Sequence, residues 1–209
     1  MKRFHSNIPG LAAMFGILLG GLFICAISNA QSKYQPSGNV KITIEGTSNI
    51  HDWTMVSDKG TCTGAIEINN GALAGITAFN FSVPAESLKS EHKAMDKNTY
   101  KALNTNKYAT ISFTVEAASI KPSGNSGYVL TTKGKLTISG VTKEILLTAN
   151  GVVNPDKSIS YTGSYKLKMT DYNVEPPSIM FGAIKTGNDI VVKFSLLLKE
   201  TEKSNLSLN

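Results

Sequence analysis

Apolar and polar residues alternate along most of this 209-residue chain, and this rhythm restricts the possible folds more than any other feature. In the segments 79–83, 111–115 and 190–198 every second residue is apolar. Alternate side chains of a β-strand lie on the same face of a sheet, so each segment is predicted to have one apolar face. A domain built from many such strands forms a sandwich or a barrel. A sandwich fills its interior with its own side chains, whereas a barrel of about eight strands can enclose a ligand.

Residues 1–30 are predicted to be a secretory signal peptide and not part of the fold. Lys2 and Arg3 precede an uncharged apolar run over residues 11–27, and the small residues at 28–30 form a cleavage site. The apolar run is also long enough to suggest a membrane anchor, but the small residues after it favour cleavage. The sequence therefore predicts one domain over residues 31–209, located in the periplasm or secreted.

The composition of residues 31–209 argues against two classes of protein. Arg3 is the only arginine, so the fork-shaped guanidinium groups that recognise bases and phosphates are missing, and we expect no nucleic-acid partner. Cys62 is the only cysteine left after cleavage, so the domain has no intrachain disulfide and depends on its hydrophobic core. Its place in a predicted strand favours a small buried side chain over a reactive thiol.

The alternation and the turn residues between its segments predict nine strands and two interruptions. Residues 85–104 read as a helix, because apolar residues recur there at spacings of three to four. Residues 171–188 read as a long apolar connection, which is typical of a lid or a binding loop, although packing against the sheet is equally compatible. The predicted strands are 39–46, 52–57, 61–69, 75–83, 110–120, 127–139, 143–153, 158–170 and 189–199.

Candidate catalytic and metal-binding residues are few. His51 and Asp52 are neighbours on a predicted strand, so their side chains point to opposite faces and form no hydrogen-bonded dyad. No nucleophile motif accompanies them. Only His51 and His92 remain as histidines after cleavage, and neither belongs to a paired ligand motif, so a zinc site with Cys62 is a weak alternative. We expect no catalytic residues, no metal site and no enzymatic activity.

Lysines recur at a spacing of four in the predicted helix, at Lys89, Lys93, Lys97 and Lys101. On a continuous helix they would form one basic stripe. The stripe is expected to be a solvated surface, and its functional alternative is a transient contact with an anionic head group or a membrane surface.

Aromatic and aliphatic residues at the apolar positions of the strands form the candidate interior. This set is compatible both with a packed interior and with an apolar pocket. Phe113, in the middle of its alternating segment, is predicted to face inward. The residues predicted to line and bind a ligand are Trp53, Phe79, Phe81, Ile111, Phe113, Phe181, Val192 and Phe194.

Several longer strings in the chain resemble those of the YceI-like family, in the same order and over essentially the whole of residues 31–209. The most specific is Gly134-Lys-Leu-Thr-Ile-Ser-Gly-Val-Thr-Lys143. The others are Gly46-Thr-Ser-Asn-Ile-His-Asp-Trp53, Leu88-Lys-Ser90 with Met95-Asp96, Tyr108-Ala-Thr-Ile-Ser-Phe113 and Met169-Thr-Asp-Tyr172.

The resemblance implies an all-β protein, an antiparallel lipocalin-like β-barrel of about eight strands with a short helical insertion. It implies that the barrel binds a long isoprenoid, such as a polyprenyl phosphate or a quinone, and that the protein has no other cofactor. Apolar burial could hold such a tail with few polar anchors. The alternative is a packed barrel that acts in a stress response or binds another protein through its surface, and a connected interior cavity would separate the two.

Overall fold

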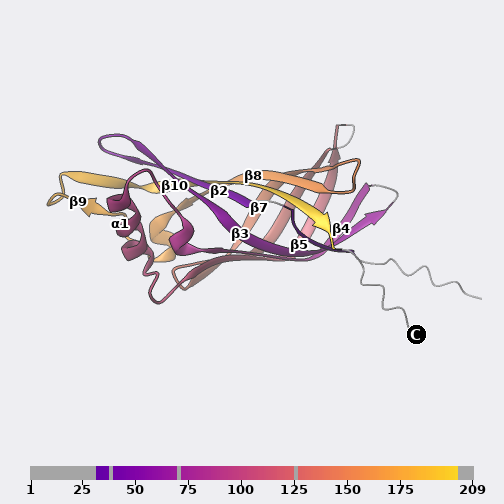
Figure 1. Cartoon of the computed structure of the whole chain (residues 1–209), viewed down its shortest axis with the longest axis horizontal. Coiled ribbons are helices and arrows are strands. Elements are labelled where there is room, and N and C mark those ends of the chain that lie inside the picture. Colours follow the sequence, from indigo (N-terminus) through magenta and orange to yellow (C-terminus); the bar gives the residue numbers. More distant parts are fainter. Residues whose placement is uncertain (1–31, 38–39, 70–71, 125–126, 202–209) are drawn as a thin grey trace, which may run out of the picture.

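Eight antiparallel strands close into a barrel in the computed structural model, which describes residues 32–37, 40–69, 72–124 and 127–201. The predicted fold class is confirmed, whereas the predicted signal peptide lies outside the described residues. Figure 1 shows the elongated barrel with its helix at one end. The barrel strands are β2 (Val40–Ser48), β3 (Asp52–Asn69), β4 (Ala72–Pro84), β5 (Thr110–Ser123), β6 (Gly127–Ile138), β7 (Val141–Val153), β8 (Ile159–Lys168) and β10 (Ile184–Glu200).

Strand β10 closes the barrel because it pairs with a strand on each side. Phe194 of β10 is in register with Ile42 of β2 and with Gly163 of β8. The other neighbours follow chain order from β2 to β8. A short strand that we did not predict, β1 (Ser32–Pro36), pairs with both β10 and β3. Strands β1 and β2 therefore share one position in the barrel wall, between β10 and β3.

The predicted strands 52–57 and 61–69 are one continuous strand, β3, so the break that we expected near residues 58–60 is wrong. On the facing strand Val40 pairs with Gly60, and Ile42 pairs with Ser57, so β3 holds one residue more than β2 at this point. An extra residue in one strand of a pair is a β-bulge. The polar residues here are accommodated by that bulge and do not form a turn.

The predicted helix over residues 85–104 is two separate elements. A single 3-10 turn, η1 (Ala85–Ser87), is followed by extended chain, and the α-helix α1 covers only Lys93–Leu103. The backbone of Lys89 makes two hydrogen bonds with Val56 of β3, of 2.7 and 2.9 Å, which hold it extended. Pairing with the barrel edge thus overrides the helical spacing. The helix ends at Asn104, which has a left-handed φ of 53°.

The predicted connection over residues 171–188 also contains short elements. It begins within the 3-10 helix η2 (Met169–Tyr172) and includes β9 (Ser178–Ile179), which pairs with the start of β10. Strand β10 begins at Ile184 and not near residue 189 as predicted, because Ile184 pairs with Ile179. The connection is thus a short hairpin that extends the barrel wall at the end where α1 lies (Figure 1).

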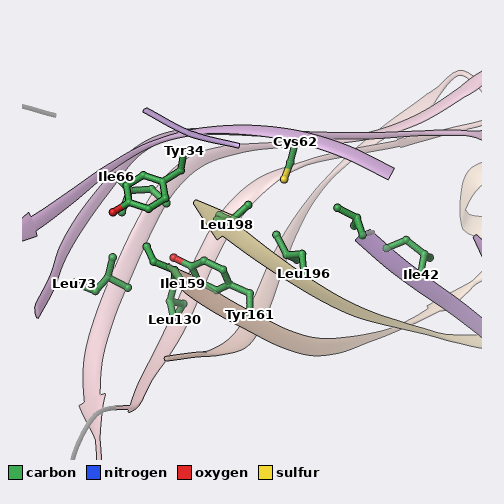
Figure 2. Close-up of a cluster of buried hydrophobic side chains, with 11 residues drawn as sticks. Tyr34, Ile42, Cys62, Ile66, Leu73, Leu130, Ile159, Tyr161, Leu196 and Leu198 are labelled. Carbon is green, nitrogen blue, oxygen red and sulfur yellow. The ribbon is translucent and has the colours of Figure 1, made fainter. Parts of the chain in front are cut away.

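The buried side chains form two clusters along the barrel axis. One lies at the end where β10 finishes, and Figure 2 shows its aliphatic side chains around Tyr34 and Tyr161. The other includes Met55 of β3 together with Leu103 of α1 and Tyr172 of η2. The first cluster also contains Cys62, whose predicted burial is confirmed; burial raises the pKa of its thiol to about 11.

Inward-facing aromatic rings pack on glycines of neighbouring strands. The ring of Trp53 covers Gly46, its partner in register, so closely that a Cβ on Gly46 would lie 2.1 Å from a ring carbon. In the same way Phe194 covers Gly163, and Phe113 covers Gly134. Glycine leaves room for the ring against the backbone of the next strand. The barrel can therefore hold large rings flat against its wall.

We predict that Gly134→Ala destabilises the barrel by about 1–3 kcal/mol, since overpacked sites cost this much. The new Cβ would lie 2.4 Å from the carbonyl oxygen of Thr114, which is backbone and cannot move without distorting β5. The measurement is the free energy of unfolding in urea. Gly75→Ala is the matched control, because its nearest neighbour is the flexible end of Glu67 at 3.2 Å, and we expect a change below about 0.5 kcal/mol. Equal effects at both sites would contradict the packing argument.

Candidate functional site: the barrel lumen

The barrel encloses a cavity of about 440 Å³, within the size range of small-molecule sites. Side chains from β2 to β8, from β10 and from α1 line it, and nearly all of them are aliphatic or aromatic. Among the described residues, the lining contains no aspartate, glutamate or lysine. The cavity argues against the alternative of a barrel packed solid.

Seven of the eight predicted ligand-binding residues line this cavity. They include the consecutive inward positions Phe79 and Phe81 of β4 and Ile111 and Phe113 of β5, and Phe81 is in register with Phe113. Their contact with a ligand stays a prediction. The seven are Trp53, Phe79, Phe81, Ile111, Phe113, Val192 and Phe194.

Phe181 is the exception, and its predicted place in the lumen is wrong. Its side chain is fully exposed, at 112 %, and is not among the residues that line the cavity. It lies in the turn between β9 and β10, where Met180 and Phe181 both have a positive φ. A turn of this kind ends the alternation, so apolar character alone did not place the side chain inside.

Several lining residues were missed, although the same alternation could have identified them. Ile42 and Ile44 of β2 alternate with polar residues, and so do Tyr161, Tyr165 and Leu167 of β8. Met55 of β3, also missed, lines the cavity below the helix and accepts a 3.3 Å hydrogen bond from Thr99 Oγ1.

Three segments border the cavity at the end of the barrel where α1 and β9 lie (Figure 1). They are the connection between β2 and β3, the start of α1, and the chain from Pro177 to Thr186. Ile50 and Ile179 line the cavity and are also 56 and 39 % exposed to solvent, so the cavity reaches the surface here. We call this end the mouth. Residues of both 85–104 and 171–188 line the cavity at this end. A lid function for 171–188 stays a prediction.

Asn49 joins two sides of the mouth, a role that the sequence analysis missed. Its side-chain amide donates to the carbonyl oxygen of Ala183 over 2.8 Å, and its side-chain oxygen accepts from the backbone N–H of Lys185, also over 2.8 Å. A backbone hydrogen bond from Asn49 N–H to the Lys185 carbonyl adds a third link. The connection between β2 and β3 is therefore held against the hairpin of β9 and β10.

Ser90 and Asp96 hold the start of α1 at the mouth. Asp96 Oδ1 accepts hydrogen bonds from the backbone N–H and the hydroxyl of Ser90, of 2.7 and 2.8 Å. Burial by itself raises the pKa of the Asp96 carboxyl, but these hydrogen bonds and the nearby charge of Lys89 outweigh it and leave the pKa below its ordinary value. A charged Asp96 thus stabilises the turn that leads into the helix.

The predicted stripe of four lysines is wrong because Lys89 does not lie on α1. Its ammonium group donates to Tyr100 Oη, and this hydrogen bond raises the pKa of Lys89. Lys93, Lys97 and Lys101 do lie on the helix, with exposed side chains. Lys89 instead fastens the extended segment before the helix to the helix itself.

The described residues show no assembled catalytic or metal centre. His51 Nδ1 lies 2.8 Å from the backbone carbonyl of its neighbour Asp52, and both side chains are exposed. No group of three or more histidine, cysteine, aspartate or glutamate side chains within the described chain could hold a metal ion. A helix long and apolar enough to cross a membrane is also not found in the described part of the chain.

Polar groups deeper in the lumen are mostly satisfied by the protein. Thr132 Oγ1, for example, donates to the Leu147 carbonyl over 3.1 Å. The hydroxyl of Tyr161 differs: among the described residues it is the one buried side-chain oxygen or nitrogen without a hydrogen-bond partner. It points into the apolar cluster at the far end of the barrel (Figure 2), and burial raises its pKa.

We predict that Tyr161→Phe stabilises the protein by about 1 kcal/mol, since an unsatisfied buried hydroxyl carries a desolvation cost that its removal relieves. The same change at Tyr100 should cost about 1 kcal/mol, because Tyr100 Oη donates to the carbonyls of Glu86 or Leu88. Urea unfolding of both variants measures the change in the free energy of unfolding, which should have opposite signs in the two variants. A loss of stability in Tyr161→Phe would show that the hydroxyl has a partner, such as a buried water.

Comparison with known families and structures supports the fold. A model of the YceI-like domain matches residues 28–198. No curated relative matches the sequence.

Among solved structures, BcnA of Burkholderia cenocepacia has a TM-score of 0.60 and 16 % identity, over 76 % of this chain and 95 % of BcnA. A polyisoprenoid-binding domain from Saccharophagus degradans, implicated in plant cell wall breakdown, also has a TM-score of 0.60, with 13 % identity over 82 % of this chain and all of that domain. The YceI protein of Campylobacter jejuni has a TM-score of 0.50 and 19 % identity, over 69 % of this chain and 85 % of its own. At these identities the likeness concerns the fold.

Proposed function

This chain belongs to the YceI-like family, and on that premise we propose that it binds a long-chain isoprenoid or a similar lipid in its lumen and sequesters or carries it. The main support for this proposal is the cavity of about 440 Å³. Its described lining has no acidic residue and no lysine, and the cavity reaches the surface at one end. The S. degradans domain, named for polyisoprenoid binding, supports the choice of ligand class.

The distribution of polar residues supports an orientation for the lipid. Ser48, His51, His92, Asn98 and Thr186 line the cavity at the mouth, whereas the deeper lining is almost entirely apolar. An apolar tail gains free energy in proportion to the apolar area that it removes from water. The tail therefore occupies the deep lumen, and the head group, whether phosphate or quinone, lies at the mouth.

A binding protein, and not an enzyme, is the role that we propose. A tail of methylene and methyl groups and the apolar side chains of the lumen interact only through dispersion and hydrophobic contacts. Binding then depends on shape and apolar area, and it needs no activated side chain.

Export to the periplasm or the medium is part of the proposal, and its support is the N-terminal pattern of charge, apolar run and small residues at 1–30. Expression in a host with a secretory pathway should yield a mature chain that begins at Gln31. N-terminal sequencing of the exported protein measures this. A chain that retains Lys2 and Arg3 in the membrane fraction would indicate an anchor instead.

Phe113→Asp should weaken lipid binding by about a hundredfold or more, because an unpaired carboxylate in an apolar lumen is strongly disfavoured. Phe113 is 7 % exposed and lines the cavity. Its neighbour Thr114 is exposed on the outer face of the same strand, so Thr114→Asp is the matched control and should bind normally. Native mass spectrometry and lipid extraction, applied to protein incubated with membranes of its host, measure the bound lipid.

Ala149→Phe provides a second variant if Phe113→Asp does not fold. Ala149 also lines the cavity, and a phenylalanine there fills space that the ligand needs without adding a charge. We expect it to fold and to retain little lipid. Wild-type protein that stays empty after exposure to polyprenyl phosphates and quinones would refute the proposed function.

A further inference from the structure

Exposed apolar side chains gather at the mouth. Ile50, Ile179, Met180 and Phe181 are 56, 39, 69 and 112 % exposed. They come from the tip between β2 and β3 and from β9 and the turn after it, which lie at the same end of the barrel in Figure 1. We call these four residues the tip patch. The other large exposed apolar residues in the described chain, such as Leu146, lie on strands of the barrel wall.

The turn that carries Met180 and Phe181 has a strained backbone. Met180 and Phe181 have φ values of 54° and 55°, in the left-handed region that large side chains rarely adopt. The turn is kept in this form by hydrogen bonds from Gly182 N–H to the Ile179 carbonyl and from Ala183 N–H to the Met180 carbonyl. Strain of this kind is retained mostly at functional sites.

The two halves of the tip patch are joined into one surface by Asn49. This residue directly precedes Ile50, and its three hydrogen bonds reach Ala183 and Lys185, just after the turn. Ile50 therefore keeps its place beside the turn that carries Met180 and Phe181. The patch is preorganised and does not need to form on contact.

The tip patch is continuous with the lumen. Ile50 and Ile179 both belong to the patch and line the cavity, and Ile184 continues the lining inward. An apolar chain that leaves the cavity here meets apolar side chains up to the outermost point of the protein. A lipid tail that crosses water instead loses the free energy of burial for every methylene exposed.

The charged residues around the mouth are nearly balanced. Those exposed next to the lining residues of the three mouth segments are Lys93, Lys97 and Lys185 against Asp52 and Glu91. A nearly balanced rim does not depend on an anionic surface, so contact at this end depends on the apolar tip.

We propose that the tip patch docks on the surface of a lipid bilayer, with Met180 and Phe181 inserted among the lipid chains, so that the mouth opens directly onto the membrane. Passage of lipid through this contact rests on the proposed function, whereas the docking itself does not. Since the rim is nearly balanced, the bilayer can be zwitterionic.

The experiment is flotation of the full mature protein with vesicles of phosphatidylcholine at low and high salt. Wild-type protein should bind with an affinity that changes less than about twofold with salt, because screening acts on charges and not on apolar insertion. Met180→Asn with Phe181→Asn should bind at least about tenfold more weakly, since two large apolar groups no longer leave water. Asparagine tolerates a positive φ, so we expect this double variant to fold, which thermal unfolding checks.

Leu146→Thr is the matched control, because Leu146 is 67 % exposed but lies on β7, away from the mouth, and its vesicle binding should equal that of the wild type. Equal binding by the double variant, no binding by the wild type, or binding that high salt abolishes would overturn the proposal. One further result would overturn it: analytical ultracentrifugation shows a wild-type dimer that the double variant does not form, and the wild type does not bind vesicles. The patch would then be an interface with a second copy of the chain.

Uptake of a polyprenyl quinone supplied on cyclodextrin separates this inference from the proposed function. Met180 and Phe181 do not line the cavity, so the wild type and the double variant should take up the quinone equally from this soluble carrier. Loss of uptake in the double variant alone would place these residues in the lumen site and overturn the docking proposal. Failure of uptake in both proteins would count against the proposed function, while vesicle binding would still decide the docking.

Discussion

Closure of the barrel by β10 is the constraint on which the rest of the structure depends. This strand pairs with β8 along ten residues and with β2 on its other side, so the eight-stranded wall has no open edge there. In a closed sheet, successive side chains of a strand face the lumen and the outside in turn. The apolar rhythm of strands as distant in sequence as β2 and β10 thereby becomes one continuous lining.

The lining must leave space, and the pairing of aromatic rings with glycines provides it. Where Trp53 lies over Gly46 and Phe194 over Gly163, the ring is held flat against the wall instead of projecting across the lumen. Barrels of about eight strands are narrow enough for side chains to fill. Side-chain placement at the wall therefore has a direct consequence for function, since it leaves the cavity of about 440 Å³.

The two ends of the barrel are built differently. At one end a buried cluster that includes Tyr34, Ile66 and Leu198 closes the lumen. Tyr161 belongs to this cluster, and its hydroxyl has no hydrogen-bond partner there. At the other end short elements with their own polar contacts, such as Ser90 with Asp96 and Asn49 with Lys185, surround an apolar opening. A lumen closed at one end and open at the other gives a long ligand one direction of entry.

Most strands, their inward faces and seven of the eight candidate lining residues could be predicted from the sequence, because alternation with a period of two is a local property that closure preserves. Three features could not be predicted from the sequence: residues 52–69 form one bulged strand, Lys89 pairs with Val56 and lies outside the helix, and Phe181 is exposed. These outcomes depend on partners distant in the sequence, such as β2 facing the bulge and Asn49 holding the hairpin. No local pattern carries that information, since the hydrogen bonds that decide these conformations exist only after the barrel has closed.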